Sequence, residues 1–169
     1  MKLLKSGVFL FSTILVFVFH LSFLRELPFF LDQFNLILVF LLLVLFFGSF
    51  GLAVNFAFSF GFLFDIYSFH FFGFYLFSYV LLVIFANYLL KNFFTNQSFY
   101  SLLGLTVFAS VIFSFLNFIF YFGEVFVLDN YFKLSFSFFL FLFIEIFYNT
   151  LFSCLSFGII KIFKKYFSI

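Results

Sequence analysis

The sequence predicts an all-α integral membrane protein, a polytopic bundle of six transmembrane helices that forms a single domain over residues 1–169. Of its residues, 67% are hydrophobic and only 8% are charged, whereas about a quarter of the residues of a soluble domain are charged. The few charges lie in short clusters between long apolar runs. A chain of this composition cannot cover its surface with polar groups, so we expect it to lie in a lipid bilayer.

The apolar runs are long enough to cross a bilayer, which takes about 20 residues in a helix. They predict helices near residues 6–24, 29–47, 50–68, 72–90, 100–122 and 135–160. The first run lacks a small-residue cleavage site at its end and is therefore predicted to be an uncleaved span. The second and third runs are separated only by the uncharged residues 48–51, so a single bent helix, and five spans in all, is the alternative.

The distribution of basic residues favours six spans. With a cytoplasmic N-terminus, the inner side would hold six of the eight Lys and Arg residues: Lys2, Lys5, Lys91, Lys161, Lys164 and Lys165. Arg25 and Lys133 would lie outside, which is the asymmetry of the positive-inside rule. Five spans would move the last three lysines outside, so we predict six spans with both termini in the cytoplasm.

Several classes of function find no support in the sequence. No basic surface is available to neutralise nucleic-acid phosphates. Cys154 is the only cysteine, which excludes an internal disulfide and a cysteine-based metal site. His20 and His70 are isolated, and the chain has neither a glycine-rich phosphate loop nor a HExxH pattern. We therefore predict no catalytic residues, no metal and no cofactor.

The third predicted helix carries a stripe of small residues that ends in an acid. Ala53, Ala57, Gly61 and Asp65 follow one another at intervals of four residues and share one face. Small residues at this spacing let helix backbones approach closely in lipid, so packing is favoured over a binding groove. Asp65 is predicted near the outer interface, where it is either solvated or accepts a hydrogen bond from the start of the fourth helix, because helix N-termini favour anions. We favour a structural role in the turn.

The last predicted helix carries a polar stripe inside its apolar run, formed by Glu145, Asn149, Ser153 and Ser156. A carboxyl group within lipid is costly and often functional, so a proton or cation relay or a binding pocket is one interpretation. The other interpretation, which we favour, is hydrogen bonding that holds this helix to the fifth. The expected partners on the fifth helix are Ser110, Ser114 and Asn117.

The segment from Gly61 to Gly73 resembles the signature of the bacterial rod shape-determining protein MreD family. That signature has a Gly, three apolar residues, an Asp, a short turn and a second Gly eight residues after the Asp, and Gly61, Asp65 and Gly73 match it. The run Asn149-Thr150-Leu151, the basic tail from Lys161 to Lys165, the length and the six-span layout agree with the family too. Phe69 and Phe71 stand where the family often has Gly and Pro.

The resemblance implies a non-enzymatic scaffold of the cell-elongation machinery in the bacterial cytoplasmic membrane. Its implied partners are an MreC-like bitopic protein, the filament protein MreB, and, directly or indirectly, the glycosyltransferase and transpeptidase that build lateral peptidoglycan. The residues from Ala53 to Gly73 named above would then serve packing or partner docking. The family is similar in fold to the substrate-binding subunits of energy-coupling-factor vitamin transporters.

Two alternatives stay open. A vitamin-binding transporter subunit would need a pocket on the outer side, for which Glu124, Asp129 and Tyr131 are the chief candidates. An ion or lipid carrier would use Glu145. Self-association is left open by the sequence.

Overall fold

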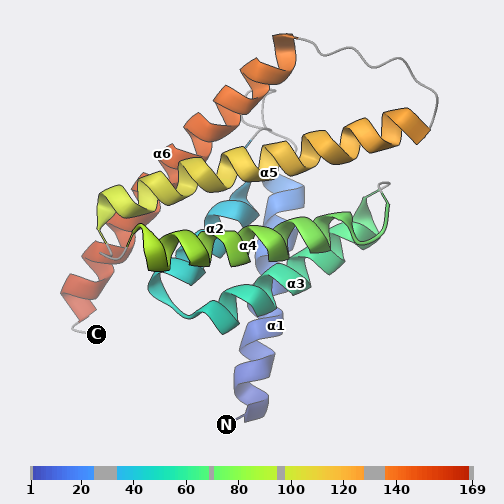
Figure 1. Cartoon of the computed structure of the whole chain (residues 1–169). Coiled ribbons are helices and arrows are strands. Elements are labelled where there is room, and N and C mark those ends of the chain that lie inside the picture. Colours follow the sequence, from blue (N-terminus) through green and yellow to red (C-terminus); the bar gives the residue numbers. More distant parts are fainter. Residues whose placement is uncertain (1, 25–33, 69–70, 95–97, 128–135, 168–169) are drawn as a thin grey trace.

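The computed structural model describes residues 2–24, 34–68, 71–94, 98–127 and 136–167, and these residues are almost wholly helical (Figure 1). The elements are α1 (Lys2–Phe19), a π-helical turn η1 (His20–Leu24), α2 (Leu36–Phe47), α3 (Phe50–Tyr67), α4 (Phe74–Asn92), α5 (Phe99–Val127) and α6 (Phe136–Phe167). Among the described residues, four helices are long and apolar enough to cross a membrane: α3, α4, α5 and α6. The chain is therefore a multi-pass helical membrane protein.

The second helix is shorter than predicted. We expected a span near 29–47, but α2 has only 12 residues, Leu36–Phe47, and residues 29–33 lie outside the described part of the chain. A helix of 12 residues rises about 18 Å, whereas the hydrocarbon core is about 30 Å thick. The helix begins here because the Asn35 side chain accepts a hydrogen bond from the backbone N–H of Leu38 at 3.0 Å. An apolar pattern does not reveal such a cap.

The helical backbone is interrupted between α2 and α3, as the six-helix interpretation requires. The N–H of Gly48 donates to the carbonyl of Val44 at 2.9 Å and closes α2. The Ser49 hydroxyl then accepts from the N–H of Leu52 at 3.4 Å and opens α3. Two separate helices, rather than one bent helix, are thus confirmed at this junction.

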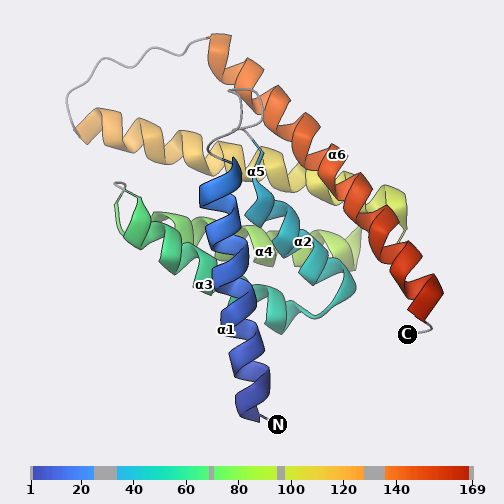
Figure 2. The same cartoon turned by 180° about the vertical axis from the view of Figure 1, so that it is seen from behind.

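The short helix α2 forms the centre of the bundle. It packs against α3, α4, α5 and α6, and Figure 2 shows it lying over α4 and α5 on the face seen from behind. Its side chains Ile37, Leu38, Leu41 and Leu42 are completely buried. Apolar residues surround this helix on nearly every side, which is typical of a helix in the middle of a bundle.

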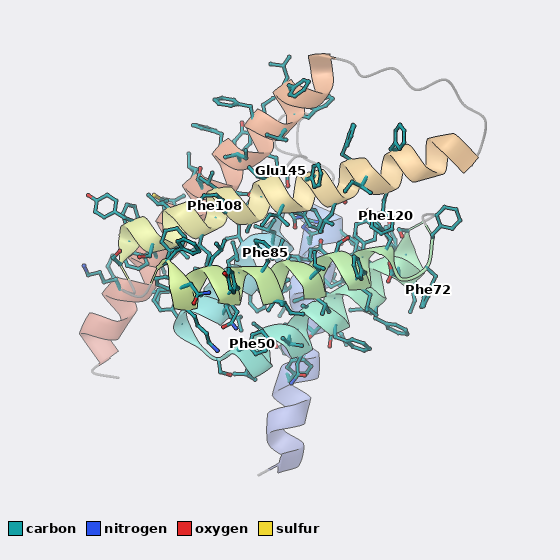
Figure 3. All side chains as sticks on the ribbon, viewed as in Figure 1. Phe50, Phe72, Phe85, Phe108, Phe120 and Glu145 are labelled. Carbon is teal, nitrogen blue, oxygen red and sulfur yellow. The ribbon has the colours of Figure 1, made fainter. Side chains whose placement is uncertain are left out.

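The outer surface of the bundle is covered with aromatic side chains. Phe72 in the turn before α4, Phe85 on α4 and Phe108 on α5 are 68%, 47% and 53% exposed (Figure 3). A soluble protein rarely exposes so much contiguous apolar surface. In a bilayer this surface faces acyl chains, so its composition agrees with a membrane location.

Candidate functional site

The carboxylate of Asp65 joins α3 to α4. Its Oδ1 accepts a hydrogen bond from the backbone N–H of Tyr75 at 2.8 Å, and its Oδ2 accepts from the N–H of Leu76 at 3.2 Å. Both donors lie in the first turn of α4, where backbone N–H groups have no partner within the helix. The side chain is only 4% exposed. Of the two alternatives for Asp65, the structure shows the hydrogen bond from the start of the fourth helix.

Gly61 lies one turn before Asp65, at the closest approach of the two helices. A Cβ atom at this position would lie 2.3 Å from Cα of Leu76 and 2.8 Å from its backbone nitrogen. Only a glycine therefore allows α3 and α4 to meet at the distance that the Asp65 hydrogen bonds need. Ala53 and Ala57, on the same face, are completely buried.

Gly73 opens α4 in a left-handed conformation, with φ of +99°. Its carbonyl accepts a hydrogen bond from the N–H of Phe77 at 2.9 Å, the first bond of the helix. No atom lies within 4 Å of the place of a Cβ, so the requirement for glycine is conformational rather than steric.

Gly61, Asp65 and Gly73 therefore build one helical hairpin, each by a different physical effect. Their neighbours in this hairpin are helices of the same chain. Ala53, Ala57 and Asp65 are covered by those helices, so in this conformation the burial favours packing over partner docking for these three residues.

A second site lies between α5 and α6, which run antiparallel. The polar ladder, as we call it, consists of three hydrogen-bonded pairs at intervals of four residues: Thr106–Ser153 at 3.2 Å, Ser110–Asn149 at 3.0 Å and Ser114–Glu145 at 2.5 Å. In the last pair the Ser114 hydroxyl donates to Oε2 of Glu145. Figure 3 labels Glu145 in the angle between α5 and α6.

The polar ladder bears out part of the predicted contacts. Ser110 and Ser114 are the partners expected on the fifth helix, whereas Asn117 is half-buried and does not belong to the ladder. Ser156 is half-buried as well and lies outside it. Thr106 was missed, although its position four residues before Ser110 could have indicated it.

Asn149 has a further contact that ties α2 to α6. It is completely buried, and its Oδ1 accepts a hydrogen bond from the backbone N–H of Asn35 at 3.0 Å. Asn35 is the residue that caps α2. The start of the central helix is thus held at the middle of α6, through two residues that lie 114 positions apart in the sequence.

A groove of 520 Å³ lies on another side of the α5–α6 pair. Its lining is almost wholly apolar and includes Leu103, Val107, Leu151 and Cys154. Thr150 also lines it, but the Thr150 hydroxyl donates to the carbonyl of Ile146 at 2.8 Å in its own helix. The groove therefore lacks the polar groups that orient a small vitamin-like ligand.

The candidates for an outer vitamin pocket are not brought together in the described residues. Glu124 falls within α5, which extends to Val127, beyond the end that we predicted. Asp129 and Tyr131 lie outside the described part of the chain. Likewise, no group of three His, Cys, Asp or Glu side chains that could hold a metal ion occurs among the residues that the structure describes.

These features define a multi-pass helical membrane protein in which most of the intramembrane polar groups described above bond to one another. Comparison of the chain with protein-family models, with curated proteins and with solved structures finds no match. The resemblance to the MreD family, and the fold similarity that it implies, therefore remain predictions that rest on the residues quoted above.

Proposed function

We propose that this chain is a non-enzymatic membrane scaffold of the bacterial cell-elongation complex, resembling MreD and acting in the cytoplasmic membrane beside an MreC-like bitopic protein. The wall-building glycosyltransferase and transpeptidase would join the same assembly, directly or through that partner.

The observation that carries the proposal is the α3–α4 hairpin. The three residues on which the resemblance rests are the three that shape this hairpin: Gly61 by close approach, Asp65 by its two backbone hydrogen bonds and Gly73 by its positive φ. A short motif made of common residues gains weight when each member has a distinct structural role at the expected junction. Such a rigid hairpin suits a protein whose task is to hold partners in place.

The experiment that tests the proposal is recovery of partners from the native host. The chain is epitope-tagged, cross-linked mildly in living cells and purified in detergent, and the co-purifying proteins are identified by mass spectrometry. An MreC-like coiled-coil protein together with wall-synthesis enzymes is the expected result. Recovery of ABC-type ATPases with a coupling subunit would instead favour the vitamin-transporter alternative and would contradict the scaffold proposal.

A pair of variants connects the hairpin to the assembly. Gly61→Leu forces α3 and α4 apart and should reduce recovery of the partners. Gly51→Leu is the matched control in the same helix, because no atom lies within 4 Å of a Cβ at Gly51. Both variants must first be shown to reach the membrane in equal amounts. An intact complex recovered with Gly61→Leu would remove the hairpin from the proposal.

A further inference from the structure

Glu145 is a carboxyl group at membrane depth. It lies within Phe139–Ile162, the part of α6 that is long and apolar enough to cross a membrane. The distance along the helix from Phe139 to Glu145 is about 9 Å, and the helix continues for about 25 Å beyond it to Ile162. The carboxyl group therefore falls in the hydrocarbon region rather than at either surface.

The groups that face Glu145 come from α4, α5 and α6 and are all uncharged in their ordinary states. Ser114 of α5 donates to Oε2, and Asn149 of α6 lies one turn further along. Tyr79 of α4, 2% exposed, lies near both Glu145 and Asn35 at the start of α2. Hydroxyl, amide and phenol groups are what the described part of the core offers to this acid.

No described cation is near enough to balance a negative charge on Glu145. Lys161 follows it by 16 residues on the same helix, a separation of about 24 Å. Lys91 lies 12 residues beyond Tyr79 on α4, a separation of about 18 Å. Asp65 is engaged with the start of α4. An unpaired carboxylate in lipid is strongly disfavoured.

A neutral carboxylic acid fits the same surroundings. It has one O–H donor and still accepts hydrogen bonds, and a serine hydroxyl both donates and accepts. The Glu145–Ser114 pair is therefore satisfied without any counter-ion when the acid carries its proton. We propose that Glu145 is a proton-binding site within the membrane, at which a proton is held reversibly on the carboxyl group beside Ser114.

This site is part of the polar ladder and is independent of the scaffold proposal. Asn149, the neighbouring member of the ladder, also holds the cap of α2 through its bond to the N–H of Asn35. Release of the proton would place a negative charge next to that contact. The bound proton is thereby linked to the packing of α2, α5 and α6.

Infrared spectroscopy of the full chain in liposomes tests the inference. The protein is produced with ¹³C-labelled glutamate carboxyl groups, which marks Glu26, Glu124 and Glu145 alone among its acids. At neutral pH we expect the carbonyl band of a protonated carboxylic acid. The band should vanish in Glu145→Gln and persist in Glu124→Gln, the matched control on α5.

A second variant assigns the band even where Glu145→Gln folds poorly. Ser114→Ala keeps the carboxyl group but removes its hydrogen-bond partner, so the band should shift in frequency without disappearing. A spectrum of the wild-type protein at neutral pH that contains glutamate only as carboxylate would overturn the inference. A protonated band that is unaffected by both Glu145→Gln and Ser114→Ala would overturn it too.

Discussion

The close approach of α3 and α4 at Gly61 predicts a large penalty for the smallest substitution, Gly61→Ala. Its Cβ would lie 2.3 Å from Cα of Leu76, and carbon atoms in contact are about 3.5 Å apart or more. The helices must therefore separate by roughly 1.2 Å. Over-packing of this kind costs about 1–3 kcal/mol. The same movement stretches the two Asp65 hydrogen bonds, each of which contributes about 1 kcal/mol.

Alanine also has a higher helix propensity than glycine, which raises the free energy of unfolding by up to about 1 kcal/mol and partly offsets these losses. The net expectation for Gly61→Ala is a free energy of unfolding lowered by about 2 kcal/mol. Gly158→Ala is the matched control, because no atom lies within 4 Å of a Cβ at Gly158 in α6. That variant should be as stable as the wild type or slightly more stable. Reversible unfolding in mixed micelles measures both, and Gly61→Ala proving no less stable than Gly158→Ala would refute the reasoning.

The remaining predictions use the same unfolding assay. Asp65→Ala should lower the free energy of unfolding by about 2 kcal/mol, because two backbone N–H groups lose their acceptor. Asp65→Asn keeps one oxygen and should lower it by roughly half as much. Equal losses in the two variants would contradict the two-bond geometry. Gly73→Ala should lower the free energy of unfolding by about 1–2 kcal/mol, because alanine is strained at a positive φ. Gly73→Asn should lower it by less. An unchanged stability of Gly73→Ala would argue against the left-handed start of α4. Asn149→Leu should lower the free energy of unfolding by about 2–3 kcal/mol, because two buried partners are left unpaired. Ser156→Ala should stay within about 0.5 kcal/mol of the wild type. Similar effects of these two substitutions would contradict the polar ladder.

The helical class and most of the helix positions could be predicted from the sequence. Long apolar runs can form only helices or closed barrels in lipid, so composition alone indicates much of the architecture. The predicted third helix, 50–68, agrees closely with α3, whose ends are marked by Ser49 and Ser68. The second helix was predicted to begin too early. Asp32 and Gln33 interrupt the apolar pattern before Phe34, and the side chain of Asn35 caps the start of α2. Hydropathy reports solvent preference and is insensitive to such local hydrogen bonds.

The sequence could predict those residues of the candidate sites that share one face of a single helix. Spacing of four residues revealed both stripes, because residues on one face of a helix recur at that interval. It also indicated the correct neighbouring helix for Glu145 and Asn149. The contact between Asn149 and the backbone of Asn35 could not be inferred, since it depends on where a central helix begins and on how three helices converge. The depth of burial of Ala53 and Ala57, and hence the choice between packing and docking, likewise required the tertiary structure.

The arrangement of helices bears on the charge pattern that predicted six spans. Ring contacts of Phe9 with Phe56 at 4.4 Å and of Phe17 with Phe64 at 5.1 Å show that α1 follows the direction of α3. Because α3 and α4, and then α5 and α6, are antiparallel pairs, the N-terminal end of α1 shares one end of the bundle with the C-terminal ends of α4 and α6. The prediction that the lysines of these three helices share one membrane face, as the positive-inside rule expects, is compatible with these helix directions. For α1 and α3 to run in the same direction, the chain between them must return across the bundle, and α2 covers about 18 Å of that return. The predicted grouping of the lysines therefore does not require α2 itself to be a full-length span.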